Sequence, residues 1–206
     1  LALETNSHIS QITECTVNKD KTKIITVSTD KTIRIWDISS GEMIRRIDTY
    51  YRDNGNNGRI NSVAIHKNNK HLAVAGFFHH NKSKPGKNDV RFYDLENGKL
   101  IKVLELTSLS AIMQLKYSDD GKYLIISSAM GKVFIWDVEN DKLKNTIDFG
   151  IESAHIHVNL HQNGNKLFLA ASQKSLVVLL ELNENEIIFS KDFQSSYQTI
   201  AYNGSE

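Results

Sequence analysis

The sequence predicts an all-β protein built from about four copies of a four-stranded antiparallel unit. Three features of the sequence support this prediction: a dipeptide that recurs four times, an alternation of apolar residues before it, and a polar turn after it. The chain has 206 residues, of which 40% are hydrophobic and 24% charged. This composition is ordinary for a globular protein, so the fold class follows from the pattern of residues.

The recurring dipeptide defines the period of the repeat. It occurs at Trp36-Asp37, Tyr93-Asp94, Trp136-Asp137 and Leu180-Glu181. Its copies start 57, 43 and 44 residues apart. Apolar residues alternate before each copy, as at Ile33 and Ile35. A period of two predicts a β-strand with one buried face.

Polar turns divide each repeat into two hairpins. The dipeptide is followed by a turn, such as Glu96-Asn97-Gly98, and then by a second apolar stretch. This order predicts a β-hairpin. A second hairpin lies upstream, most clearly around Asp119-Asp120-Gly121. Two hairpins per repeat give a meander of four short strands.

A repeat of roughly 40 to 45 residues with four strands and a Trp-Asp ending resembles the WD-repeat (WD40) β-propeller family. The resemblance covers nearly the whole chain and implies a partial propeller formed by a single segment, residues 1–206. It places the blades at about 8–48, 58–105, 109–148 and 153–192. Residues 1–5 and 196–206 would belong to incomplete neighbouring blades, so the remaining blades are expected in a longer chain.

The resemblance also implies a structural network in the first repeat. In this family a His, a Ser or Thr, an Asp and the Trp of the dipeptide are linked by hydrogen bonds, and His8, Thr26, Asp30 and Trp36 stand at the corresponding intervals. Such a set is chemically consistent, because the indole N–H, the hydroxyl and the imidazole form a chain of donors ending on the carboxylate. The other repeats depart from this pattern: Tyr93 and Leu180 replace the Trp, and Met130 and Lys174 replace the Asp.

A Thr, His and Asp set also occurs in catalytic triads. No nucleophile-elbow motif is present, however, and a Thr that faces a buried Trp has no access to a substrate. No paired cysteines occur, and the adjacent His79 and His80 point apart on a strand or loop. No phosphate-binding loop precedes a helix. The sequence therefore predicts no catalytic residues, no metal and no cofactor.

Charge and hydropathy exclude some partners. The net charge is +1, from 25 basic and 24 acidic side chains spread along the chain, so neither nucleic acid nor a membrane surface is an expected partner. The longest apolar runs are far shorter than the roughly 20 residues that cross a bilayer. Cys15 lies where an alternating strand would bury it, which predicts a small core residue. With no visible leader, a cytoplasmic location is expected.

The function expected from this pattern is a non-catalytic scaffold that binds other proteins or peptides. The alternative is a regulatory or sensor segment of a larger enzyme, possibly bacterial, such as a caspase-like peptidase, in which case the active site would lie outside this chain.

Two unusual segments are candidate partner-binding loops, expected at one end of the sheets. The connection 49–59 carries Tyr50, Tyr51 and Arg52. The stretch from Val74 to Tyr93 is nine residues longer than the equivalent stretch of the first repeat. Its insertion, at 77–89, contains Phe78, His79, Lys82 and Lys84. Aromatic and Arg side chains are typical of interface hot spots, although a solvated, neutral insertion would have the same length.

Overall fold

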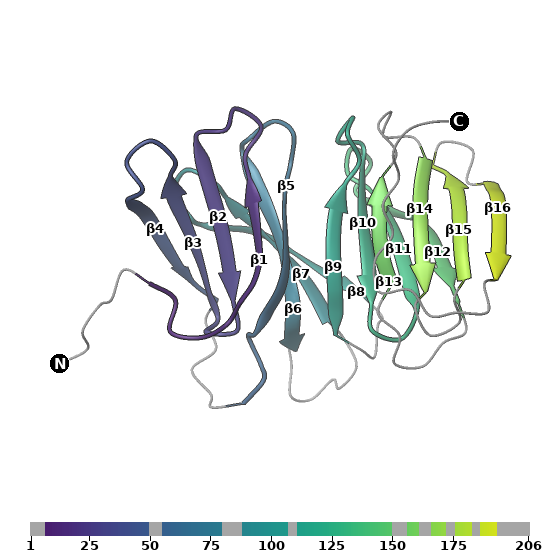
Figure 1. Ribbon diagram of the computed structural model, residues 1–206, viewed down its shortest axis with the longest axis horizontal. Coiled ribbons are helices and arrows are strands. Elements are labelled where there is room, and N and C mark those ends of the chain that lie inside the picture. The colour runs from purple at the N-terminus through teal and green to yellow at the C-terminus, as the bar shows by residue number, and fades with distance from the viewer. Residues whose placement is uncertain are drawn as a thin grey trace. The chain divides into compact units, whose positions relative to one another are not determined.

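The protein consists of antiparallel sheets of four strands each. The structure, a computed structural model, describes residues 7–49, 55–79, 88–106, 111–149, 156–160, 166–171, 176–182 and 186–192. These residues form sixteen strands in four sheets, with no helix among them (Figure 1). Within each sheet the strands are hydrogen-bonded in chain order. The prediction of an all-β protein with four four-stranded blades is therefore confirmed.

The chain folds as two compact units, Leu1–Ala111 and Ile112–Glu206. The first unit contains two blades, whose strands are β1 (Ile12–Val17), β2 (Lys23–Ser28), β3 (Thr32–Asp37) and β4 (Met43–Asp48), then β5 (Ile60–Ile65), β6 (His71–His79), β7 (Asn88–Asp94) and β8 (Leu100–Leu106). The second unit contains the other two, with strands β9 (Ile112–Tyr117), β10 (Tyr123–Ser128), β11 (Lys132–Asp137) and β12 (Lys142–Asp148), then β13 (Ile156–Leu160), β14 (Lys166–Ala171), β15 (Leu176–Glu181) and β16 (Glu186–Asp192).

The first two blades pack face to face around a shared apolar core. Ile25 and Val27 of β2 and Ile33 and Ile35 of β3 alternate toward this core, which is completed from the second blade by residues such as Leu72. Each such side chain contributes roughly 1.5 to 3 kcal/mol when fully buried. The period of two in the sequence therefore identifies the packed face of the sheet correctly.

Polar contacts add to this packing at the innermost strands. The Glu14 carboxylate on β1 accepts hydrogen bonds from the Ser62 hydroxyl at 2.6 Å and the Val63 N–H at 2.7 Å on β5. The Thr13 hydroxyl donates to the Ile60 carbonyl at 2.8 Å. Nothing in the repeat pattern indicated these contacts, because both residues are polar members of a strand expected to be apolar toward the core.

Cys15 is exposed, so the prediction that it is a core residue is wrong. The pairing of β1 with β2 shifts register between Ile12 and Glu14. As a result Thr13 and Glu14 both reach the second blade, and Cys15, the next residue, lies on the other face of the strand.

The second unit has its own core, formed by its two blades. Ile125 of β10 and Val133 and Ile135 of β11 pack with Leu167, Leu169 and Leu180. Leu180 stands where the first blade has Trp36, and it is fully buried. No helix long and apolar enough to cross a membrane occurs in the part of the chain that the structure describes.

Candidate functional site

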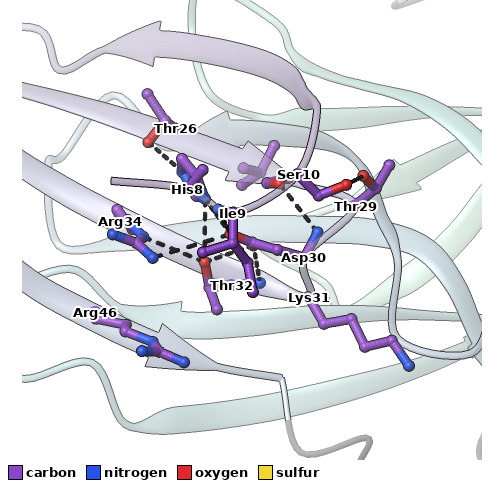
Figure 2. Close-up of polar contacts among 12 residues, drawn as sticks. His8, Ile9, Ser10, Thr26, Thr29, Asp30, Lys31, Thr32, Arg34 and Arg46 are labelled. Carbon is purple, nitrogen blue, oxygen red and sulfur yellow. Dashed lines mark hydrogen bonds and ion pairs between the residues drawn. The ribbon is translucent and has the colours of Figure 1, made fainter. Parts of the chain in front are cut away.

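The first blade contains a continuous hydrogen-bonded chain of four side chains. Trp36 on β3 donates its indole N–H to the Thr26 hydroxyl on β2 at 2.8 Å. The Thr26 oxygen lies 2.8 Å from Nε2 of His8, and Nδ1 of His8 lies 2.9 Å from Oδ2 of Asp30. In Figure 2 His8 lies between the labelled Thr26 and Asp30. The structure thus brings together all four residues that the family resemblance singled out.

The order of donors indicates the state of the histidine ring. The Asp30 carboxylate can only accept a hydrogen bond, so Nδ1 of His8 carries the proton of that contact. The Thr26 oxygen accepts the indole hydrogen bond and shares a second hydrogen bond with Nε2 of His8. Because the Thr26 hydroxyl is held by Trp36 and His8, it is a structural link and is not presented to a substrate.

Asp30 accepts hydrogen bonds from more groups than the sequence indicated. Besides His8, it accepts the Ile9 N–H at 3.1 Å, the Thr32 N–H at 3.0 Å and the Thr32 hydroxyl at 2.7 Å. The Arg34 guanidinium lies 3.9 Å from the carboxylate, and the Asp30 and Arg34 side chains are 1% and 2% exposed. Arg34 and Trp36 are two residues apart on β3 and therefore lie on the same face of the strand. A charged residue on the face that carries the buried Trp was the sequence signal for the contact between Arg34 and Asp30.

These contacts keep Asp30 ionised. Burial alone would raise the pKa of Asp30, but the hydrogen bonds from Thr32 and His8 outweigh it and lower that pKa below its ordinary value of 3.8. A carboxyl group whose pKa is lowered by folding makes its full contribution to stability at pH values above its pKa in the unfolded state. That contribution is lost as the pH falls through the lower, folded value.

The pH dependence of stability tests this assignment. We expect the urea midpoint of the wild type to fall as the pH drops below about 4, and the Asp30→Asn variant to lack this component of the fall. Urea titrations of both proteins over an acidic pH series measure it. Parallel pH profiles for the two proteins would contradict the assignment.

The hydroxyl at position 26 gives a second test. Thr26→Val keeps the shape of the side chain but leaves the Trp36 N–H and His8 Nε2 without their shared partner, and we expect a loss of about 1 to 3 kcal/mol in the free energy of unfolding. Thr26→Ser is the matched control, because it keeps the hydroxyl, and it should retain most of the stability. Equal losses in the two variants would show that the hydroxyl does not matter.

The network also positions the segment before β1. Asp30 holds the backbone of Ile9, and the Ser10 hydroxyl lies 2.7 Å from the Thr29 hydroxyl (Figure 2). The Thr29 N–H donates to the Gln11 carbonyl at 3.0 Å. The Ile9 side chain is 81% exposed, and its backbone is held in place by these hydrogen bonds.

The Asp of the signature dipeptide caps the following turn, a role that the spacing of the repeat does not reveal. Asp37 accepts the N–H groups of Ser39 and Ser40, both at 2.9 Å. Asp94 and Asp137 accept backbone N–H groups of their own turns in the same way. Hydrogen bonds, led by the Ser39 hydroxyl, lower the pKa of Asp37, and the Asn140 N–H leads the same effect at Asp137.

The second and third blades use different contacts around the dipeptide. Arg91, two residues before Tyr93, is buried with its guanidinium 3.6 Å from the Asp89 carboxylate and 3.3 Å from the Thr49 carbonyl. In the third blade the Trp136 indole donates to Asp141 at 3.2 Å. A buried arginine at this position is thus common to the first two blades, whereas the four-residue network is formed in the first.

The predicted partner-binding residues fall into three groups: residues outside the described part of the chain, a residue at a strand end, and a buried core residue. Tyr50, Tyr51, Arg52, Lys82 and Lys84 lie outside the described residues. His79 is the last residue of β6 and pairs with Asn88 of β7.

Phe78 is 0% exposed in the core of the first unit, so its assignment to a partner-binding loop is wrong. The insertion at 77–89 begins and ends inside strands, because β6 continues to His79 and β7 begins at Asn88. The Arg91 guanidinium lies 4.6 Å from the centre of the Phe78 ring. Phe78 is therefore a packing residue at the end of a lengthened hairpin.

No group of three or more metal-binding side chains occurs among the described residues. The site is a set of hydrogen bonds that hold the backbone of exposed loop residues in place. This geometry favours a surface that contacts another molecule.

Comparisons with known proteins agree with this architecture. The sequence profile of the family described as "WD domain, G-beta repeat" matches residues 3–37. The chain is 25% identical to COMPASS component SWD3 of Saccharomyces cerevisiae over 137 residues, which are 63% of this chain and 39% of that protein. It is 28% identical to Target of rapamycin complex subunit wat1 of Schizosaccharomyces pombe over 181 residues, 85% of this chain and 52% of that protein.

A third relative is Eukaryotic translation initiation factor 3 subunit I of Aspergillus terreus, 26% identical over 149 residues, 69% of this chain and 39% of that protein. The chain spans about half or less of the length of these three relatives. The chain thus contains a WD repeat at residues 3–37, and its four-stranded blades, its recurring dipeptide with a capped turn and these matches make it similar to WD-repeat proteins.

Proposed function

We propose that the chain is a non-catalytic module that binds other proteins or peptides. The observation that carries this proposal is the nature of its relatives: three of them are named as a component or subunit of a larger assembly. None of these three is named as a peptidase, and no contact among the described residues favours the peptidase-linked alternative.

The chemistry of the first blade supports the same proposal. The Thr26 hydroxyl, the His8 ring and the Asp30 carboxylate are engaged with one another and with Trp36 and Thr32. The His8 and Asp30 side chains are 2% and 1% exposed. Groups held in this way stabilise loop ends and do not reach a bound molecule.

The proposed contact surface lies where the connections 49–59 and 77–89 leave the strands. The Gly58 N–H donates to the Phe77 carbonyl at 2.8 Å, and the Phe77 N–H donates to the Arg59 carbonyl at 2.9 Å. The Gly76 position requires a glycine, because a Cβ there would lie 2.1 Å from the Arg59 carbonyl oxygen. The end of the first connection therefore lies beside the start of the second, and a partner that contacts one of these two positions is within reach of the other.

Affinity purification tests the proposal. A tagged copy of the chain should recover a defined set of proteins, and Tyr51→Ala with Lys82→Glu and Lys84→Glu should reduce their yield at an unchanged unfolding midpoint. The matched control is Leu143→Ala with Lys99→Glu and Lys142→Glu, which makes the same change of charge at exposed residues outside the two connections. Recovery of the same partners by both triple variants at wild-type yield would place the contact surface elsewhere.

A further inference from the structure

The inner turns of the first two blades are in direct contact. They are residues 18–22, between β1 and β2, and residues 66–70, between β5 and β6, here called the basic turn pair. The Lys19 N–H donates to the Asn69 side-chain oxygen at 3.0 Å. Figure 1 shows both turns at the same end of the first unit, at the top of the view.

The basic turn pair carries an excess of positive charge. Lys19, Lys21, Lys67 and Lys70 are all exposed, and Asp20 is the single carboxylate of the two turns. Among the residues that the structure describes, none of these four ammonium groups is within ion-pair distance of a carboxylate. Four like charges on two adjoining turns repel one another, and an anionic ligand would relieve that repulsion.

The backbone beneath these lysines is rigidly held. The buried Asn18 side chain accepts the N–H groups of Thr22 at 3.0 Å and Lys23 at 2.8 Å. In the second turn the Asn68 side chain accepts the Lys70 N–H at 2.9 Å, and the Asn69 N–H donates to the His66 carbonyl at 2.9 Å. A fixed backbone reduces the conformational entropy that is lost when a ligand binds.

The blade geometry does not by itself require this charge. In each turn of the pair, the N–H of the fourth residue donates to the carbonyl of the first residue. The equivalent turn of the third blade, residues 118–122, has the same hydrogen bond, from Gly121 to Ser118. That turn contains Asp119 and Asp120, and Lys122 lies 3.7 Å from the Asp120 carboxylate. Similar turn geometry is thus compatible with a net negative charge, so the lysines of the first unit are not explained by folding.

We infer that the basic turn pair binds a short, carboxylate-rich peptide segment of a partner protein, an inference that rests on the proposed function and specifies the chemistry of one partner. A single-stranded nucleic acid is the less suitable ligand, because such sites combine a basic groove with aromatic side chains that stack on bases. The ring of His66, in the second turn, is stacked on that of His71 with centroids 4.8 Å apart. The chain as a whole has a net charge of only +1.

Fluorescence anisotropy with a fluorescein-labelled oligoglutamate peptide and the 206-residue chain tests the inference. The wild type should bind, and binding should weaken as salt is raised from low to physiological ionic strength. Lys19→Glu with Lys70→Glu should reduce the affinity about tenfold or more, and the neutral pair Lys19→Gln with Lys70→Gln should reduce it less. All variants should keep the wild-type unfolding midpoint, since both side chains are exposed.

The matched control is Lys99→Glu with Lys142→Glu, which changes the net charge equally at exposed residues outside the basic turn pair, one in the turn before β8 and one at the start of β12. No binding by the wild type, or an equal loss in this control, would overturn the inference. Tighter binding of an oligothymidylate probe, lost in the same variants, would overturn it in favour of nucleic acid. Partner recovery that depends on Tyr51, Lys82 and Lys84, without oligoglutamate binding, would leave the proposed function standing and remove this inference alone.

Discussion

Asp30→Ala is expected to lower the free energy of unfolding of the first unit by about 3 to 5 kcal/mol, the usual cost of removing one partner of a buried ion pair. The substitution removes the carboxylate that lies beside the buried Arg34 guanidinium and that accepts the Ile9 and Thr32 N–H groups. It also leaves Nδ1 of His8 without its carboxylate partner.

This effect is measured by urea unfolding followed through tryptophan fluorescence. The chain has two tryptophans, so a Trp136→Phe background assigns the signal to Trp36 in the first unit. Glu42→Ala, an exposed carboxylate of the turn between β3 and β4 in the same unit, is the control and should change stability by no more than about 0.5 kcal/mol. A comparably small effect of Asp30→Ala would show that the network does not stabilise the blade.

Phe78→Ala is expected to cost about 3 to 5 kcal/mol, as large-to-small changes of buried aromatic residues do. The ring is completely buried between the first two blades, and its loss leaves a cavity and removes the ring against which Arg91 lies. Chemical denaturation of the first unit measures the loss.

Phe77→Ala is the matched control for this prediction. Phe77 is the preceding residue of the same strand, but it is only half-buried, so its truncation should cost clearly less. If Phe78→Ala were as mild as Phe77→Ala, the hairpin would not extend into the core as the structure describes it, and Phe78 would again be a candidate for the binding surface.

The repeat could be predicted from the sequence because its signals are local. The dipeptide, the alternation before it and the turn after it each reflect contacts within one hairpin, and all four blades have the predicted strand order. The His8, Thr26, Asp30 and Trp36 set was accessible because a family pattern fixes its spacing.

The remaining features depend on contacts that spacing does not encode. Arg34 and Thr32 join the Asp30 network through the face of β3 on which they lie. The shift of register in β1 places Cys15 at the surface. The additional residues of the second blade lengthen strands as well as the connection. The length of an insertion does not distinguish these two cases, so the sequence predicts a loop at Phe78.

Cross-linking mass spectrometry on a purified complex of the chain with its partner tests the central claim, that the protein binds partners through the loop ends of rigid blades. With a lysine-reactive reagent, intermolecular cross-links are expected at Lys82 and Lys84 of the proposed contact surface, and at Lys19 and Lys70 when the partner carries an acidic segment. Cross-links confined to lysines of the outermost strands, such as Lys102 of β8 and Lys144 of β12, would contradict this account of how the protein works.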